Sequence, residues 1–152
     1  MHKPYFKKLD GPEVLRARVS RVVRFEECDA VGIMWHGRYP SYFEDAREAM
    51  GSAYGISYLD FSAADTIVPI KTMYIDYVKP LFYRREYRVE AILHWSDAAR
   101  VNIEYEIRDH AGETVTSGYS IQLMLDRSGN LLFDAPEFYK IFRMRWLNGE
   151  FT

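Results

Sequence analysis

Alternating hydrophobic and polar positions mark the first element of the chain. From Val14 to Phe25, every second residue starting at Leu15 is apolar except Arg21, and the positions between them are mostly arginine and serine. A period of two over this length predicts a β-strand with one face toward a core.

The spacing of apolar residues then changes to three and four positions between Tyr39 and Ala53, which predicts an amphipathic helix of about four turns. Pro40 is compatible only with the first turn, so the helix begins near residues 37–39. Gly55 follows the last apolar position, where a C-terminal cap is expected.

Period-two patterns return after Thr66. They predict strands over residues 66–80, 86–95, 100–109 and 114–126, with turns at 110–113 and 127–130, and a short helix over about 136–147. The connections favour one antiparallel sheet with the long helix in its concave face, an α+β fold. We expect one domain spanning residues 1–152 with its core over about 14–133, and uncovered sheet edges that call for a partner subunit.

Composition narrows the class of protein. The 152 residues are 48% hydrophobic and 16% aromatic, and the formal net charge is −2, which argues against a nucleic-acid partner. A single cysteine excludes an intrachain disulfide framework and fits a reducing compartment. Neither a secretory leader nor a membrane-spanning stretch is visible, so we expect a cytoplasmic protein without a membrane partner.

The chemistry is concentrated between Arg24 and Met50. Asp29 lies a few residues before the helix N-terminus, where backbone N–H groups and the helix dipole attract anions. Cys28 is a weak candidate nucleophile, because the neighbouring carboxylates raise the pKa of a thiol, and we expect it to act as a small buried hydrophobe. No cluster has metal-ligand spacing and no glycine-rich phosphate loop is present, so we expect neither a metal nor a cofactor.

The run "FEECDAVGIMWHGRY", residues 25–39, leads into a helix carrying "FEDAR", residues 43–47. This pattern resembles the 4-hydroxybenzoyl-CoA thioesterase family of the hotdog fold, an antiparallel sheet wrapped around one long central helix. A weaker second match lies between Pro69 and Pro80, and the resemblance covers residues 14–125. The chain departs from the family at Arg38, where asparagine is usual, and at Arg84-Arg85, where many members carry acidic residues.

The resemblance implies an acyl-CoA thioesterase that hydrolyses an acyl- or aryl-CoA, with coenzyme A as part of the substrate. Asp29 matches the catalytic aspartate, as nucleophile or as general base. The backbone N–H of His36, helped by that of Gly37, matches the oxyanion donor. Taken alone, Asp29 is an ordinary turn residue. Because Gly32, Trp35 and Tyr39 also match the family pattern at the expected spacing, the catalytic interpretation is favoured instead.

The resemblance also implies a homodimer or homotetramer with sites at subunit interfaces. We expect Gly32, Trp35 and Tyr39 to line the substrate site, with the His36 side chain facing the acyl pocket. Arg84 and Arg85, near Lys79 and Arg88, are candidates for the CoA phosphates, although a solvated turn explains them equally well.

Two structural pairings are also expected. Glu44 and Arg47 are three residues apart on the long helix and are placed to pair. The arginines of the first strand are placed to pair across the sheet with Glu104 and Glu106.

Three alternatives remain open. An acyl-carrier-protein thioesterase needs a basic docking surface, against which the net charge argues weakly. A hotdog dehydratase needs a histidine in a proline-rich loop, and this stretch has only Pro40. A non-catalytic acyl-CoA binder on the same fold is the competing class, since fold does not fix function.

Overall fold

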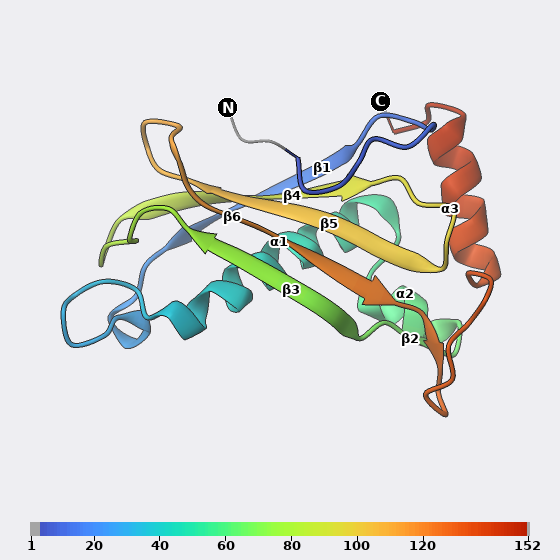
Figure 1. Cartoon of the computed structure of the whole chain (residues 1–152), viewed down its shortest axis with the longest axis horizontal. Helices are drawn as coiled ribbons and strands as arrows, with labels where there is room; N and C mark the ends of the chain where they lie inside the picture. The colour runs from blue at the N-terminus through green and yellow to red at the C-terminus, as the bar shows by residue number, and fades with distance from the viewer. Residues whose placement is uncertain (1–3, 152) are drawn as a thin grey trace.

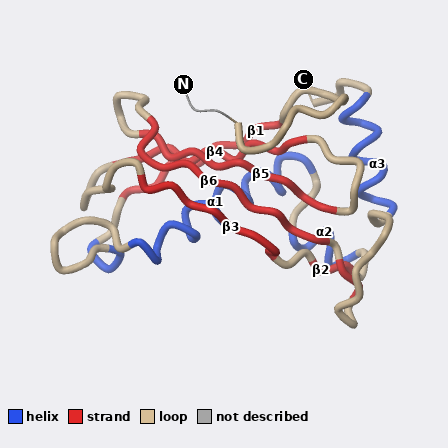
Figure 2. Tube along the Cα trace, viewed as in Figure 1, coloured by secondary structure: helices blue, strands red, loops and turns tan. Residues whose placement is uncertain are grey.

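The computed structural model describes residues 4–151 and contains one five-stranded sheet in the order β1-β4-β5-β6-β3, in which all neighbouring strands are antiparallel (Figures 1 and 2). Its strands are β1 (Leu15–Val22), β3 (Ile70–Tyr77), β4 (Glu86–His94), β5 (Arg100–Arg108) and β6 (Thr114–Leu123). A second, two-stranded sheet pairs β2 (Thr66–Ile67) with β7 (Leu125–Asp126). The predicted antiparallel sheet is confirmed.

The long helix α1 (Tyr39–Tyr54) crosses one face of this sheet (Figure 1). Its apolar side contacts the sheet, and the Phe43 ring stacks on Tyr105 of β5 at a centroid distance of 4.4 Å. Both side chains are buried, as are the inward positions of β4 and β5. The predicted helix bounds hold: Pro40 lies in the first turn, and Gly55 caps the C-terminus with a φ of 71°.

The short helix α2 (Tyr58–Ala63) was not predicted. Its local signal is a capping box, in which the Ser57 hydroxyl accepts from the Asp60 N–H at 3.2 Å and the Asp60 carboxylate accepts from the Ser57 N–H at 2.8 Å. The predicted strand over residues 66–80 is also wrong in its length. It divides at Val68-Pro69 into β2 and β3, because proline has no N–H to donate to a ladder.

Strand β1 is shorter than predicted and ends at Val22. The chain turns there into a 3₁₀ turn at Phe25–Glu27, so Phe25 leaves the core face and is 78% exposed. Val23 remains buried, and its N–H donates to the Arg85 carbonyl at 3.0 Å.

Helix α3 (Glu137–Leu147) begins after Pro136 and closes one end of the sheet (Figure 1). Its buried residues are Tyr139, Phe142 and Trp146. The Trp146 indole packs against Trp95 at 5.2 Å and donates to the Glu13 carbonyl at 2.8 Å. No helix among residues 4–151 is long and apolar enough to cross a membrane.

The outer face of the sheet, opposite α1, is polar but largely buried. Glu104 is only 3% exposed, because the N-terminal segment lies over it and the Tyr5 N–H donates to its carboxylate at 2.9 Å. His94 Nε2 lies 2.9 Å from the same carboxylate. The expected arginine pairing is therefore wrong here, since Arg16 and Arg18 instead bind Glu90 on the adjacent strand β4.

Glu106 does not pair with an arginine of the first strand either. Its partner is Arg108 on the same strand, β5, whose guanidinium donates to the Glu106 carboxylate at 2.7 Å. Strand β4 separates β1 from β5 in the sheet order, so a carboxylate on β4 is the nearer partner for the arginines of β1.

The expected Glu44–Arg47 pair does not form. Arg47 is 1% exposed and donates to Gln122 Oε1 at 3.0 Å and to the Ile56 carbonyl at 3.1 Å. Glu44 accepts instead from the Tyr58 hydroxyl at 3.1 Å. The guanidinium thus turns inward from α1 toward the sheet.

Replacing Gly118 of β6 by alanine is expected to destabilise the protein by about 1–3 kcal/mol, because overpacking of this kind shifts neighbouring groups. An added Cβ would lie 2.2 Å from the Tyr74 carbonyl oxygen and 3.0 Å from the Phe43 ring. Urea unfolding measures the change. Ser128→Ala, in an exposed turn, is the control and should stay within about 0.5 kcal/mol; an equal midpoint for both variants would contradict the close helix–sheet approach.

Candidate active site

A tight hairpin over residues 27–35 precedes the helix. The Asp29 N–H donates to the Ile33 carbonyl at 2.9 Å, and the Trp35 N–H donates to the Glu27 carbonyl at 2.8 Å. Gly32 closes the turn with a φ of 85°, in the left-handed region that favours glycine. The structure therefore gives Gly32 a role in the turn of the hairpin.

Asp29 lies at the exposed end of this hairpin. Its Oδ1 accepts the Val31 N–H at 2.9 Å, so the residue does carry out the turn role that Asp has in many proteins. Oδ2 accepts no hydrogen bond from any residue that the structure describes. One carboxylate oxygen is therefore held in place and the other is open to a ligand.

The chain enters α1 through a 3₁₀ turn at His36–Arg38, in which the Arg38 N–H donates to the Trp35 carbonyl at 3.0 Å. The N–H groups of His36 and Gly37 donate to no acceptor within residues 4–151. They are the unsatisfied donors expected at the start of a helix. An oxygen with developing negative charge could accept from both.

The hairpin separates the carboxylate from the backbone donors. Asp29 is opposite Ile33, and the paired segment continues to Trp35, after which His36 begins the 3₁₀ turn. The structure places the carboxylate and the donors on one hairpin–helix unit without direct contact between them.

Aromatic side chains hold the start of the helix. The Trp35 ring lies so close over Gly37 that a Cβ there would be 2.3 Å from it, so any larger residue at this position would displace the ring. The Tyr77 hydroxyl donates to the His36 carbonyl at 3.0 Å, and its ring meets Tyr39 edge-on at 4.7 Å. Trp35 is 48% exposed, whereas Tyr39 is buried, and burial raises the pKa of Tyr39 to about 12.

The segment 81–85 lies beside the hairpin. The Met34 N–H donates to the Leu81 carbonyl at 2.8 Å, and Phe82 pairs with Ile33. This pairing brings Arg84 and Arg85, both exposed, next to the candidate site. The Arg85 guanidinium lies over the Phe82 ring at 4.5 Å.

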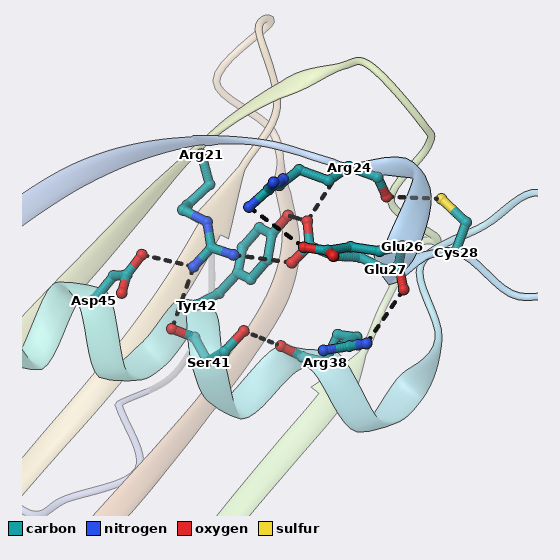
Figure 3. A network of polar contacts seen from close by, with 9 residues as sticks. All are labelled: Arg21, Arg24, Glu26, Glu27, Cys28, Arg38, Ser41, Tyr42 and Asp45. Atoms are coloured by element: carbon teal, nitrogen blue, oxygen red, sulfur yellow. Dashed lines mark hydrogen bonds and ion pairs between the residues drawn. The ribbon is translucent and has the colours of Figure 1, made fainter.

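A buried carboxylate, missed from the sequence, holds the hairpin base (Figure 3). Glu27 is 4% exposed and accepts from the Arg21 guanidinium, the Tyr42 hydroxyl and the Arg24 N–H, each at 2.9 Å. Arg21 also donates to Asp45 of α1 at 2.6 Å. Burial and then the bond to Glu27 raise the pKa of Tyr42, so its hydroxyl stays a donor.

Cys28 is half-buried and packs against the core. Burial and then the charges of Glu27 and Asp29 raise the pKa of its thiol, which disfavours the nucleophilic thiolate. Within the described part of the chain, no group of three or more His, Cys, Asp or Glu side chains could hold a metal ion.

Exposed apolar side chains surround the hairpin. They come from the hairpin itself, from the turn before it and from the segments beside it: Phe25, Val31, Trp35, Tyr77, Val78, Phe82 and Tyr83. Apolar surface of this extent around a polar site is typical of a ligand or subunit contact.

Comparison with known proteins gives one family. Residues 23–142 match the Thioesterase-like superfamily. A 1,4-dihydroxy-2-naphthoyl-CoA hydrolase from Synechococcus elongatus is 27% identical over 120 residues, which cover 78% of this chain and 88% of that protein.

Two solved structures of proteins named as thioesterases have a similar fold. A DHNA-CoA thioesterase from Staphylococcus aureus matches with a TM-score of 0.77 and 25% identity, over 89% of this chain and 94% of that chain. Slr0204, a 1,4-dihydroxy-2-naphthoyl-CoA thioesterase from Synechocystis, matches in fold with a TM-score of 0.75 at 16% identity, over 85% and 96% of the two chains. The predicted α+β hotdog fold is confirmed.

Replacing Glu27 by alanine is expected to cost about 3 kcal/mol or more of stability, because it leaves Arg21 and Tyr42 without their buried acceptor. Glu26→Ala is the matched control: its ion pair with Arg24, at 3.3 Å, is exposed, and the loss should stay under about 1 kcal/mol. Denaturant unfolding of both variants measures the difference, and equal losses would show that the Glu27 contacts do not stabilise the hairpin.

Proposed function

The chain belongs to the Thioesterase-like superfamily, and on that basis we propose that it hydrolyses the thioester of an acyl-CoA to the free acid and coenzyme A. The observation that carries the proposal is the hairpin–helix unit, which presents an open carboxylate oxygen at Asp29 and two unsatisfied backbone donors at His36 and Gly37.

The two groups supply complementary chemistry. The Asp29 carboxylate attacks the thioester carbonyl, forming an anhydride that water then opens, or it takes a proton from an attacking water. The N–H groups of His36 and Gly37 stabilise the oxyanion that forms in either case. Coenzyme A leaves as its thiolate and takes up a proton from solvent. The reaction requires the thioester carbonyl to lie about 3 Å from the attacking oxygen and about 3 Å from the backbone donors.

We propose an aromatic acyl group as the preferred substrate, within or close to the 4-hydroxybenzoyl-CoA type. The exposed rings of Trp35, Phe82 and Tyr83 offer flat apolar surface beside the hairpin. Relatives named as hydrolases of 1,4-dihydroxy-2-naphthoyl-CoA support the same class.

The working unit is proposed to be a homodimer or a homotetramer with the site at a subunit interface. Phe25 and Val31 are each 78% exposed in the single chain, and strand β3 leaves one edge of the sheet unpaired. A second copy over this region would enclose the carboxylate and exclude water from the acyl group.

Replacing Asp29 by asparagine is expected to lower kcat by roughly 10²–10⁴-fold, because the amide can neither attack nor accept a proton. The fold should persist, since an asparagine side-chain oxygen can still accept the Val31 N–H. Release of free CoA thiol measures the rate. Cys28→Ala is the control, and it should keep full activity. Full activity of D29N would leave Asp29 with its turn role only. If the wild type binds acyl-CoA without hydrolysing it, the protein is a non-catalytic acyl-CoA binder.

A panel of acyl-CoAs is expected to show a higher kcat/KM for aromatic than for straight-chain acyl groups of similar size. The reason is the aromatic surface around the hairpin, which contacts a planar acyl group over a larger apolar area. Equal or reversed preferences would overturn the substrate class while leaving thioester hydrolysis intact.

A further inference from the structure

Four arginine side chains gather on the outer face of the sheet, opposite α1. They surround a cleft of about 360 Å³ together with Glu90 and Gly112. We call Arg16, Arg18, Arg88 and Arg108 the arginine cluster. Two of them come from β1, one from β4 and one from the end of β5.

The cluster keeps an excess of positive charge. Glu90, 6% exposed, accepts from both Arg16 and Arg18, and Glu106 accepts from Arg108 at 2.7 Å. Within this cleft Glu90 is the lining carboxylate against four guanidinium groups, and Glu106 pairs with Arg108. Two further carboxylates, Glu86 and Asp109, line the adjoining cleft that Arg88 also reaches. The Arg88 side chain has no hydrogen bond or ion pair with any residue in the described range 4–151.

The pairing of β4 with β5 also places two of these positive charges side by side. Arg88 lies directly opposite Arg108 across the β4–β5 ladder. Like charges directly opposite each other on a sheet are destabilising, and an anion between them would remove that cost. Guanidinium groups present planar forks of donors that match phosphate oxygens, so the chemistry favours a phosphorylated ligand.

The cluster is connected to the candidate site by a series of clefts. A first cleft is lined by Phe82 and Arg85, beside the hairpin. A second shares four lining residues with the first, and it also reaches Arg88; the shared residues are Glu86, Tyr87, Asp109 and His110. Arg88 in turn lines the cleft of the arginine cluster. The three clefts therefore adjoin one another between Phe82, which pairs with Ile33 of the hairpin, and the arginine cluster.

We propose that the arginine cluster binds the phosphorylated nucleotide end of the coenzyme A substrate, an inference that rests on the proposed function. The thioester would lie at Asp29, the uncharged pantetheine arm along the middle clefts, and the phosphates at Arg88 and its neighbours. The cluster would thus contribute to substrate affinity and take no part in bond breaking.

The first test is binding of adenosine 3′,5′-bisphosphate by titration calorimetry. Arg88→Gln should raise its Kd about tenfold, as expected for loss of one charge-assisted contact. Lys140→Gln removes one charge on the exposed side of α3 and should leave the Kd unchanged. An unchanged Kd in R88Q would overturn the proposal. So would equally tight binding of inorganic tripolyphosphate, which would mark a general polyanion site.

The second test separates this inference from the proposed hydrolysis. Arg88→Gln should raise KM for an acyl-CoA about tenfold without changing kcat, and should not affect the same acyl group on N-acetylcysteamine, which lacks the nucleotide. If wild type hydrolyses acyl-CoA and R88Q is unaffected, this inference is wrong and the function stands. If nothing is hydrolysed while R88Q still binds the bisphosphate more weakly, the function is wrong and the nucleotide site stands.

Discussion

The buried carboxylate of Glu27 is the interaction on which the candidate site depends. It accepts from β1 through Arg21, from the turn before the hairpin through the Arg24 N–H, and from α1 through Tyr42 (Figure 3). A charge in this position is tolerated because both carboxylate oxygens accept hydrogen bonds, and one of the three donors is cationic. The same contacts fix where the hairpin begins relative to the helix, and therefore where Asp29 lies relative to the free N–H groups.

Close packing then fixes the other half of the site. The Trp35 ring occupies the space where a side chain at position 37 would lie, and the Tyr77 hydroxyl holds the His36 carbonyl. Both contacts orient the first turn of the helix, in which the N–H groups of His36 and Gly37 have no acceptor within residues 4–151. The side chains that pack against this turn therefore help to set the direction of these two donors.

Sequence reasoning succeeded where the determining contacts are local. The start of α1 at Pro40 and the Gly55 cap depend on neighbours within a few residues, and the spacing of apolar residues together with the proline and the glycine reveals them. It failed where partners are distant: alternation alone does not show that the N-terminal segment covers Glu104. The role of Glu27 was missed for the same reason, since its partner Tyr42 is fifteen residues away.

The charge that a ligand meets also depends on local structure. The chain as a whole carries −2, which argues against a field strong enough to attract nucleic acid. The sheet nonetheless places Arg88 opposite Arg108 on one face, in a cleft lined by four arginines and one carboxylate, Glu90. Screening limits the reach of exposed charges to about 10 Å, so a ligand responds to this local excess and not to the total. A mildly acidic protein can therefore bind an anionic substrate if strand register gathers its arginines in one cleft.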